Sequence, residues 1–253
     1  MHLSSFFEKV ADREDGDGSQ DDAKRAAAQD ALDLVESGMK LGLGTGSTVE
    51  FFLQGLARRI AQGLDVKGVP TSTVTEKRAL ELGVPLLGGP HFPELRTDLC
   101  VDGADRVDAA GNLVKGGGGA LFREKLVALH SNHVCILVDP SKITKVFDDS
   151  FAIPVECLPF GIDDTISALA QLGCRAVRRR GAKDWFVTDN GNAIVDCQFS
   201  HIPDPTASLL RISAVTGVVE VGIFCDLLDR LIVGFKDGST LSWPRTKSLA
   251  VTG

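Results

Sequence analysis

Short apolar segments alternate with helical segments between residues 21 and 150, and this alternation limits the folds open to the chain. Residues 39–60 and 67–85 each predict a short strand, a polar turn and a helix, and residues 98–105 and 133–142 each predict a further strand. Strands that alternate with helices form a mostly parallel sheet covered on both faces. We therefore expect an α/β fold in this part of the chain.

The pattern changes after about residue 150. Strands are expected within 153–159, 174–180 and 217–224, helices within 163–173 and 204–215, and a hairpin around the Asn-Gly turn of 185–199. This order approximates a split β-α-β unit with an added hairpin strand, as in ferredoxin-like domains. A second, smaller α+β domain is therefore expected.

The domain boundaries follow from these two patterns. Residues 12–22 are acidic and contain glycine, which favours a mobile lead-in over a packed segment. We expect a lead-in over residues 1–20, a larger domain over 21–150 plus 225–253, and the smaller domain over 151–224.

The net charge and the cysteines limit the partners and the cellular compartment that can be expected. Lys and Arg total 27 against 34 Asp and Glu, a net charge of -7 that argues against nucleic acid as a partner. The six cysteines are widely spaced without a C-x-x-C pair, as expected for free thiols in a reducing compartment. No apolar run approaches the ~20 residues of a membrane span, and the first residues do not resemble a signal peptide. A cytoplasmic enzyme without membrane or nucleic-acid partners is expected.

Polar side chains follow all four predicted strands of the first region. They are Thr45–Thr48, Thr71–Thr73, Asp102–Asp105 and Asp139–Lys142. Because ligands of open α/β sheets bind outside the carboxyl ends of the strands, we expect a binding site at this edge.

The run "GLGTGST" (Gly42–Thr48) fits a small phosphate. Its glycines allow an anion to approach the backbone, and Ser47 and Thr48 lie at a predicted helix N-terminus, which carries positive partial charge. The lysine of a nucleotide P-loop is missing, and Ser47 occupies the third glycine position of a dinucleotide fingerprint. A tight turn with a Ser/Thr cap is the structural alternative.

The turn "DGAD" places Asp102 and Asp105 three positions apart, with small Gly103 and Ala104 between them. Both carboxylates can face one crevice, where they could bind sugar hydroxyls or transfer a hydroxyl proton. Aspartates of this kind also occur as turn and cap residues. No His and no third acidic residue stand at ligand spacing, so no metal site is expected.

Four glycines follow Lys115 in "KGGGGALFREK". Each glycine costs roughly 0.5–1 kcal/mol relative to alanine, which favours a backbone that must wrap a ligand and present N–H groups to an oxyanion. Lys115 can add a positive charge, and Glu124 lies in the early turns of the next predicted helix. Considered alone, Glu124 is expected to be a surface carboxylate. Because Asp102, Asp105 and Lys115 are expected at the same sheet edge, a functional role is favoured instead.

These segments together resemble ribose-5-phosphate isomerase, type A. The resemblance rests on "GLGTGST", "VDGAD", "KGGGGALFREK" and "VDPSK", continues through "VTDNGNAIVDC" and "GVVEVGIF", and covers about residues 21–224. It implies an aldose–ketose isomerase of D-ribose 5-phosphate and D-ribulose 5-phosphate in the non-oxidative pentose phosphate pathway, without metal or cofactor. The implied fold is a Rossmann-like domain bearing a small ferredoxin-like α+β lid, assembled as a homodimer or homotetramer.

The resemblance also implies roles for individual residues. Glu124 would be the proton acceptor, assisted by Asp102, Asp105 and Lys115. The implied substrate-binding residues are Lys24, Thr45, Gly46, Ser47, Thr48, Asp102, Gly103, Ala104, Asp105, Lys115, Gly116, Gly117, Gly118 and Lys142. Lys24 and Lys142 would complete the phosphate site, although each could also be a surface lysine.

The chain departs from the family pattern at three places. Its acidic lead-in and its C-terminal segment are longer than expected, and the turn "VPTSTVTEK" is about one residue shorter, so no substrate contact is assigned to Ser72 or Thr73. Two other classes stay open: a sugar-phosphate sensor domain without turnover, and a transferase of acyl-CoA type that uses a glutamate as nucleophile.

Overall fold

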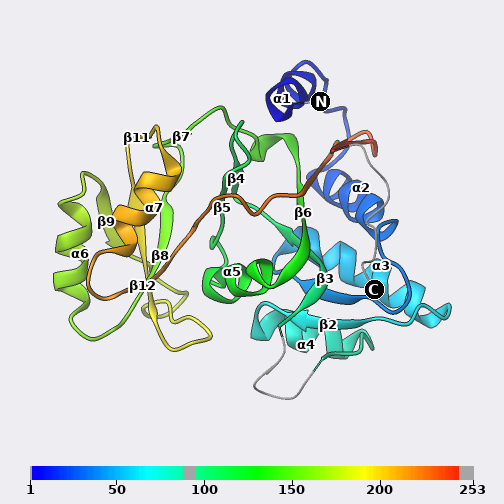
Figure 1. Cartoon of the computed structure of the whole chain (residues 1–253), viewed down its shortest axis with the longest axis horizontal. Coiled ribbons are helices and arrows are strands. Elements are labelled where there is room, and N and C mark those ends of the chain that lie inside the picture. The colour runs from blue at the N-terminus through cyan, green and yellow to red at the C-terminus, as the bar shows by residue number, and fades with distance from the viewer. Residues whose placement is uncertain (1, 88–94, 245–253) are drawn as a thin grey trace. The chain divides into compact units, whose positions relative to one another are not determined.

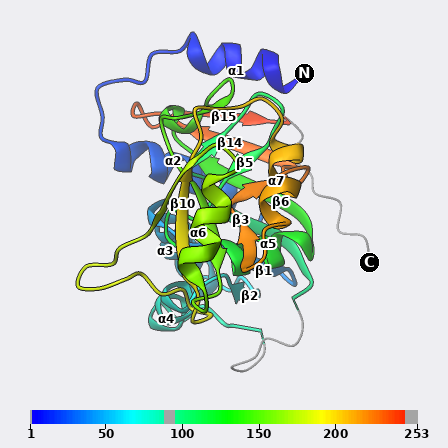
Figure 2. The same cartoon turned by 90° about the vertical axis from the view of Figure 1, so that its left-hand side faces the viewer.

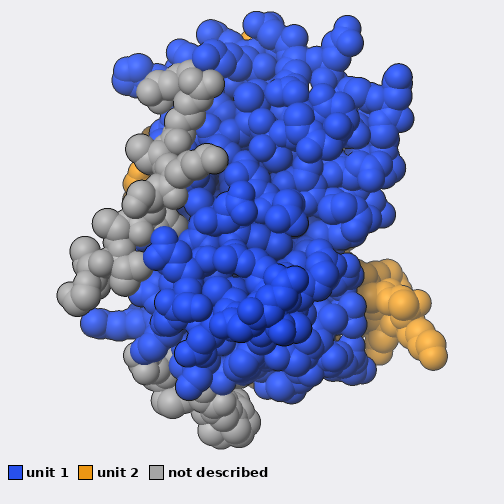
Figure 3. Space-filling model, turned by 90° about the vertical axis from the view of Figure 1, so that its right-hand side faces the viewer, with its two compact units in different colours: residues 1–104, 123–143, 227–253 blue, residues 105–122, 144–226 orange. Residues whose placement is uncertain are grey.

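The computed structural model describes residues 2–87 and 95–244 of the chain. The chain divides into two compact units, coloured separately in Figure 3. Unit 1 comprises Met1–Ala104, Arg123–Ile143 and Leu227–Gly253, and unit 2 comprises Asp105–Phe122 and Thr144–Asp226. In the described ranges, no helix is long and apolar enough to cross a membrane.

Unit 1 is built on a six-stranded sheet in the order β15-β14-β6-β3-β1-β2 (Figure 2). Its strands are β1 (Lys40–Leu43), β2 (Lys67–Pro70), β3 (Thr97–Gly103), β6 (Ser131–Val138), β14 (Arg230–Gly234) and β15 (Thr240–Trp243). All pairings are parallel except that of β14 with β15. The prediction of a mostly parallel sheet is confirmed. The strand order reverses between β1 and β3, and such a switch point is where α/β sheets bind ligands.

Helices cover both faces of this sheet (Figure 1). They are α2 (Gln20–Leu32), α3 (Ser47–Ala61), α4 (Thr73–Glu81), α5 (Leu121–Leu129, in unit 1 from Arg123 onward) and the short 3-10 helix η1 (Pro140–Lys142). Leu41 and Leu43 of β1 join the buried core with apolar residues of α2 and α3. Gly42, which strand alternation turns to the other face, lies against Val127 of α5.

An additional helix, α1 (Leu3–Ala11), begins the chain and contacts edge strand β15 (Figure 2). Leu3, Phe6, Phe7 and Val10 are buried and follow the i, i+3, i+4, i+7 spacing of an amphipathic helix. Part of the expected acidic lead-in is therefore a packed helix. The apolar spacing within residues 3–10 is the signal for this helix, whereas the acidic residues that follow it led to the prediction of a lead-in.

Unit 2 contains a four-stranded antiparallel sheet in the order β12-β8-β10-β9 with two helices. Its elements are β8 (Ile153–Cys157), α6 (Ile162–Ala170), β9 (Arg175–Arg178), β10 (Ala193–Gln198), α7 (Pro205–Ser213) and β12 (Val218–Val221). Numbered along the chain, these strands take the order 4-1-3-2, a split β-α-β arrangement that matches the ferredoxin-like expectation. Alternate apolar residues of these strands form the core with α6 and α7.

Two smaller sheets complete unit 2. One joins β4 (Arg106–Val107), β5 (Leu113–Val114) and β13 (Ile223–Phe224), and the other pairs β7 (Phe147–Asp148) with β11 (His201–Ile202). Their two-residue strands carry no readable periodicity in the sequence.

The compact units divide the chain differently from the expected domains. Residues 105–122, 144–150 and 225–226 group with unit 2, whereas the sequence patterns assigned them to the larger domain. The backbone gives the reason for the first segment, because β5 pairs with β13 and the Lys115 N–H donates to the Gly222 carbonyl at 2.9 Å. The boundaries drawn from the sequence stay a prediction, and residues 245–253 lie outside the described ranges.

Candidate active site

In unit 1, the turns after β1 and β3 meet at the switch point of the sheet. The Thr45 N–H donates to Asp102 Oδ1 at 3.1 Å, and the Gly103 N–H donates to the same oxygen at 2.7 Å. Asp102 is only 1% exposed. These bonds bring together three of the predicted site residues around one buried carboxylate.

Gly44 allows this contact because it has no side chain. A Cβ on Gly44 would lie 2.1 Å from Asp102 Oδ1 and 2.7 Å from the Asp102 Cα. The glycine-rich turn therefore serves a close approach between two strand ends. Gly46 follows at a positive φ of 118° and precedes α3, so that exposed Ser47 and half-buried Thr48 form the first turn of a 15-residue helix. A helix N-terminus of this kind attracts a phosphate.

Four hydroxyl groups hold the turn after β1 to the turn after β2. Thr45 Oγ1 lies 2.9 Å from Thr71 Oγ1, 2.8 Å from Ser72 Oγ and 3.2 Å from Thr75 Oγ1. Thr75 Oγ1 also donates to the Gly44 carbonyl at 2.8 Å. Ser72, to which no substrate contact was assigned, thus binds Thr45 and caps α4 by accepting from the Thr75 N–H. The cluster fixes the backbone that carries the predicted phosphate site.

Glu124 lies in the first turn of α5, as expected, and it is 5% exposed. The surface alternative for this residue is wrong, because a solvated carboxylate would be exposed. Packing of Val127 against Gly42 of β1 fixes α5 on the sheet. Burial of a carboxylate is costly and is found mainly where it is paired or functional.

The two lysines expected at the phosphate differ in their surroundings. Lys24 lies in α2 and forms an ion pair with Asp21, with Nζ 3.3 Å from Oδ1. Lys142 ends η1, whose first turn is capped by Asp139 Oδ1 accepting from the Ser141 N–H at 2.9 Å. The predicted turn "DPSK" is therefore a capped helical turn that presents a half-buried lysine.

In unit 2, Asp105 binds the glycine run. Asp105 Oδ2 accepts from the Gly117 N–H at 2.7 Å, and a Cβ on Gly117 would lie 2.6 Å from Asp105 Oδ1. Lys115 is buried, and its ammonium lies 5.7 Å from the centroid of the Phe224 ring. Gly119 has a positive φ of 78°, and a Cβ there would lie 2.3 Å from the Phe186 ring. These glycines are thus required by contacts of the loop with its own unit.

Arg179, which was not among the predicted site residues, also contacts the glycine run. Its guanidinium donates to the carbonyls of Gly116 and Gly117, each at 2.9 Å. The sequence offered one signal, because successive side chains of an extended segment point to opposite sides. Arg178 and Arg180 both stack on Trp185, so the side chain of Arg179 between them points the other way. Three consecutive arginines otherwise suggest a solvated segment.

No group of three or more His, Cys, Asp or Glu residues that could hold a metal ion occurs within residues 2–87 and 95–244. In unit 1 the described site residues provide buried carboxylates and hydroxyls, which can transfer protons. In unit 2 they provide an ammonium group and backbone N–H groups, which can stabilise an oxyanion.

Comparisons with known proteins agree on one family. The model of the family Ribose 5-phosphate isomerase A (phosphoriboisomerase A) matches residues 67–238. Ribose-5-phosphate isomerase A 1 of Oceanobacillus iheyensis is 43% identical over 219 residues, covering 86% of this chain and 96% of that protein.

Solved structures of the same family resemble this chain along most of its length. Ribose 5-phosphate isomerase A of Methanocaldococcus jannaschii matches with a TM-score of 0.81 and 38% identity, covering 88% of this chain and 99% of the other. A D-ribose-5-phosphate isomerase in complex with phospho-erythronic acid matches with a TM-score of 0.82 and 35% identity, covering 87% of this chain and 96% of the other.

Proposed function

The chain belongs to the ribose 5-phosphate isomerase A family, and we propose that Glu124 is the base with which it isomerises its substrate. The enzyme is an aldose–ketose isomerase that interconverts D-ribose 5-phosphate and D-ribulose 5-phosphate, a reaction of the non-oxidative pentose phosphate pathway. Family membership favours this activity over a sensor domain or a glutamate-dependent transferase. The observation that carries the base assignment is the burial of Glu124 directly after the glycine run.

Isomerisation moves one proton between adjacent carbons. The Glu124 carboxylate takes the proton from C2 of the open-chain aldose, and the electrons of the C2–H bond form a C1–C2 double bond while O1 becomes negatively charged. The product is a cis-enediolate. Protonated Glu124 then returns the proton to C1, and transfer of the O2 proton to O1 yields the ketose. A carboxylate can act as this base near neutral pH when it is shielded from water.

Charge that develops on the enediolate needs positive partners. Lys115 supplies an ammonium group, and exposed Gly118 supplies a backbone N–H. A well-placed donor of this kind is worth roughly 3 kcal/mol in the transition state. The N–H groups of Gly116–Gly118 were all expected to bind the oxyanion. The Gly117 N–H is not included in this proposal, because it donates to Asp105. Asp105 thus holds the loop as well as a substrate hydroxyl.

Asp102 is proposed to assist ring opening or to carry the proton between O2 and O1. Its Oδ1 accepts hydrogen bonds from the N–H groups of Thr45 and Gly103. These bonds fix the orientation of the carboxylate before the substrate binds. A fixed carboxylate transfers protons efficiently because no reorganisation is needed at the reacting atoms.

The phosphate is proposed to bind at the N-terminus of α3. Gly46, Ser47 and Thr48 supply N–H and hydroxyl groups there, and Lys142 and Lys24 supply positive charge. The binding energy of a phosphate distant from C1 and C2 orients the reacting carbons.

Substitution of Glu124 tests the base assignment. Glu124→Gln keeps the shape of the side chain and removes the base, so turnover of ribose 5-phosphate should fall by a factor of about 10² or more. Phospho-erythronic acid, whose carboxylate resembles an enediolate in shape and charge, should still bind. Exchange of a C1 hydrogen with D2O during turnover should be lost together with activity. Glu81→Gln on α4 is the isosteric control and should retain full turnover; near-normal turnover of Glu124→Gln would refute the assignment.

Assembly and compartment are also proposed. A homodimer or homotetramer follows from the family resemblance, and light scattering of the purified 26.9 kDa chain distinguishes these assemblies from a monomer. A cytoplasmic location is supported by six free cysteines, which suit a reducing compartment. Fractionation of the source cells tests it.

A further inference from the structure

We propose that Arg179 is a positioning residue of the isomerase, which fixes the peptide planes of the glycine run so that their N–H groups face the substrate side. The inference rests on the proposed role of the glycine run as an oxyanion cradle. Arg179 Nη1 donates to the carbonyls of both Gly116 and Gly117, each at 2.9 Å. All of these groups belong to unit 2.

The guanidinium is itself held rigidly. Its Nε donates to Asp196 Oδ2 at 2.9 Å and its Nη2 donates to Asp196 Oδ1, a two-point contact with a carboxylate of β10. The side chain of Arg179 is 15% exposed and lies 5.7 Å from the Phe186 ring. Asp196 balances the charge of Arg179, and Nη1 donates to the loop, so Arg179 serves the protein and not the substrate phosphate.

The bonds from Arg179 to the two carbonyls also determine the direction of the neighbouring N–H groups. In a trans peptide, the C=O and the next residue's N–H point in opposite directions. Two carbonyls drawn to Arg179 therefore turn the N–H groups of Gly117 and Gly118 away from it. The bond of the Gly117 N–H to Asp105 at 2.7 Å agrees with this direction. The Gly118 N–H is left as a donor for a ligand oxygen.

A run of glycines needs such an anchor from outside. Glycine loses more conformational freedom on ordering than any other residue, and the run has no side chains with which to fix itself. In the loop, Arg179 binds only the carbonyls of Gly116 and Gly117, so it can hold the loop without crowding the surface that faces the substrate. Hydrogen bonds from a cation also polarise each peptide unit and strengthen its N–H as a donor.

The test compares Arg179→Ala with Arg180→Ala. Both remove one positive charge from neighbouring positions, so their long-range effects on an anionic substrate match. Arg180, however, stacks on Trp185 and forms no hydrogen bond with the glycine run within residues 2–87 and 95–244. We expect kcat of Arg179→Ala to fall about 10–100-fold with a smaller change in KM, since a misplaced donor acts mainly on the transition state. Arg180→Ala should keep kcat within about twofold. Added guanidinium chloride at millimolar concentration should partly restore kcat in Arg179→Ala, whereas equal sodium chloride should not.

A second variant, Arg179→Lys, tests the proposal if Arg179→Ala does not fold. Arg179→Lys retains the charge but offers no planar fork to reach Asp196 and two carbonyls together, so faster hydrogen exchange at the Gly117 amide and reduced kcat should appear together. Unchanged kcat in Arg179→Lys and Arg179→Ala would overturn the proposal, as would an equal loss in Arg180→Ala. A wrong base assignment can be told apart from a wrong role for Arg179. In that case Glu124→Gln would remain active, whereas kcat of the Arg179 variants would still be reduced.

Discussion

The Thr45 N–H donates a 3.1 Å hydrogen bond to Asp102 Oδ1 and thereby joins the ends of two neighbouring parallel strands. These strands, β1 and β3, flank the point where the order of the sheet reverses. The phosphate-binding turn and the acidic turn are therefore mechanically connected. A change that displaces one turn should displace the other.

Gly44→Ala tests this connection. The new Cβ would meet Asp102 side-chain and backbone atoms at 2.1–2.7 Å, so Asp102 must move or the strands must separate. We expect a loss of about 1–3 kcal/mol or more in the free energy of unfolding and at least a tenfold fall in kcat. Gly103→Ala is the control for stability, since the nearest atom to its Cβ, the Leu137 carbonyl oxygen, lies at 3.8 Å. Equal urea midpoints for the two variants would contradict this account.

Thr75→Val tests the hydroxyl cluster. Valine keeps the shape of the side chain but deletes the bond to the Gly44 carbonyl and the contacts with Thr45 and Ser72. Leaving these buried groups short of a partner should cost about 1–3 kcal/mol in urea unfolding and raise KM for ribose 5-phosphate. Thr75→Ser restores the hydroxyl and should recover most of both. A Thr75→Val enzyme with the wild-type KM would show that the cluster does not position the phosphate turn.

The sequence predicted the parallel sheet and the strand ends that carry the site because both depend on local patterns. Short apolar runs and glycine turns are visible within a few residues, as in the segments that became β1 and β3. The position of β3 beside β1 is a long-range pairing that no local pattern encodes. Strand β4 pairs locally with β5, but β5 also pairs with β13, where Val114 lies opposite Ile223. This long-range pairing groups residues 105–122 with a different unit from the one expected.

For the site, side-chain types were predictable and backbone directions were not. Glu124 and Asp102 were selected by residue type and position, and both are buried. The direction of the Gly117 N–H toward Asp105 depends on dihedral angles that glycine leaves open. Arg179 was missed because three consecutive arginines suggest a solvated segment, and because its bonds to the main-chain carbonyls of Gly116 and Gly117 leave no trace in residue identity.

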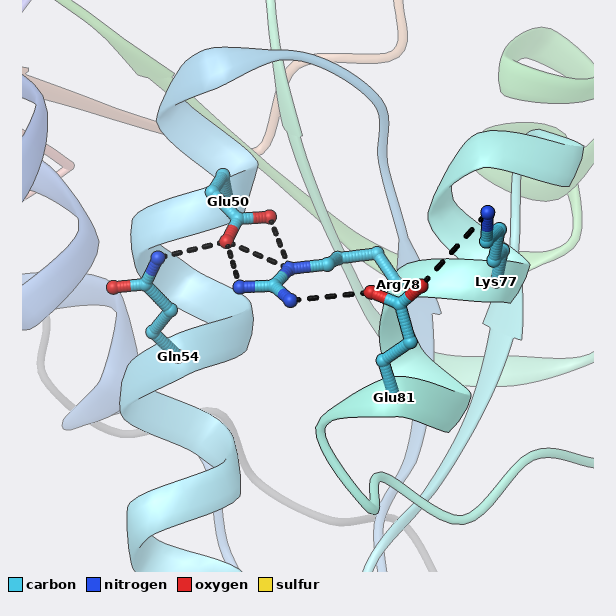
Figure 4. A network of polar contacts seen from close by, with 5 residues as sticks. All are labelled: Glu50, Gln54, Lys77, Arg78 and Glu81. Atoms are coloured by element: carbon cyan, nitrogen blue, oxygen red, sulfur yellow. Dashed lines mark hydrogen bonds and ion pairs between the residues drawn. The ribbon is translucent and has the colours of Figure 1, made fainter.

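A polar network between α3 and α4 predicts a pH dependence of stability (Figure 4). Arg78 donates to both oxygens of Glu50 at 2.7–3.0 Å and to Glu81 at 3.2 Å. The hydrogen bonds from Arg78 lower the pKa of Glu50 below its ordinary value of 4.5. A carboxyl group whose folded pKa is lowered stabilises the fold above its unfolded pKa, and this contribution disappears as the pH falls through the folded pKa.

Glu50→Gln should therefore lower Tm at neutral pH by about 1–3 °C, because the pair is partly exposed and screened. Glu81→Gln, which removes the longer contacts with Arg78 at 3.2 Å and Lys77 at 4.0 Å, should change Tm less. The deficit of Glu50→Gln relative to wild type should shrink as the pH falls below 4.5, as measured by scanning calorimetry. A Tm deficit of Glu50→Gln that grows as the pH falls would contradict the predicted direction of the pH dependence.

Thiol labelling provides a prediction about unit 2. Burial raises the pKa of the Cys157 thiol to about 12, so at about pH 8 only roughly one molecule in 10⁴ carries the reactive thiolate. Cys174 is half-buried, and a hydrogen bond from the Cys197 thiol lowers its pKa. Iodoacetamide should therefore modify Cys174 well before Cys157 in the native enzyme, as read by peptide mass spectrometry. Unfolding in urea should bring the two rates within about twofold, since the difference arises from the folded environment; similar rates in the native enzyme would contradict the burial of Cys157.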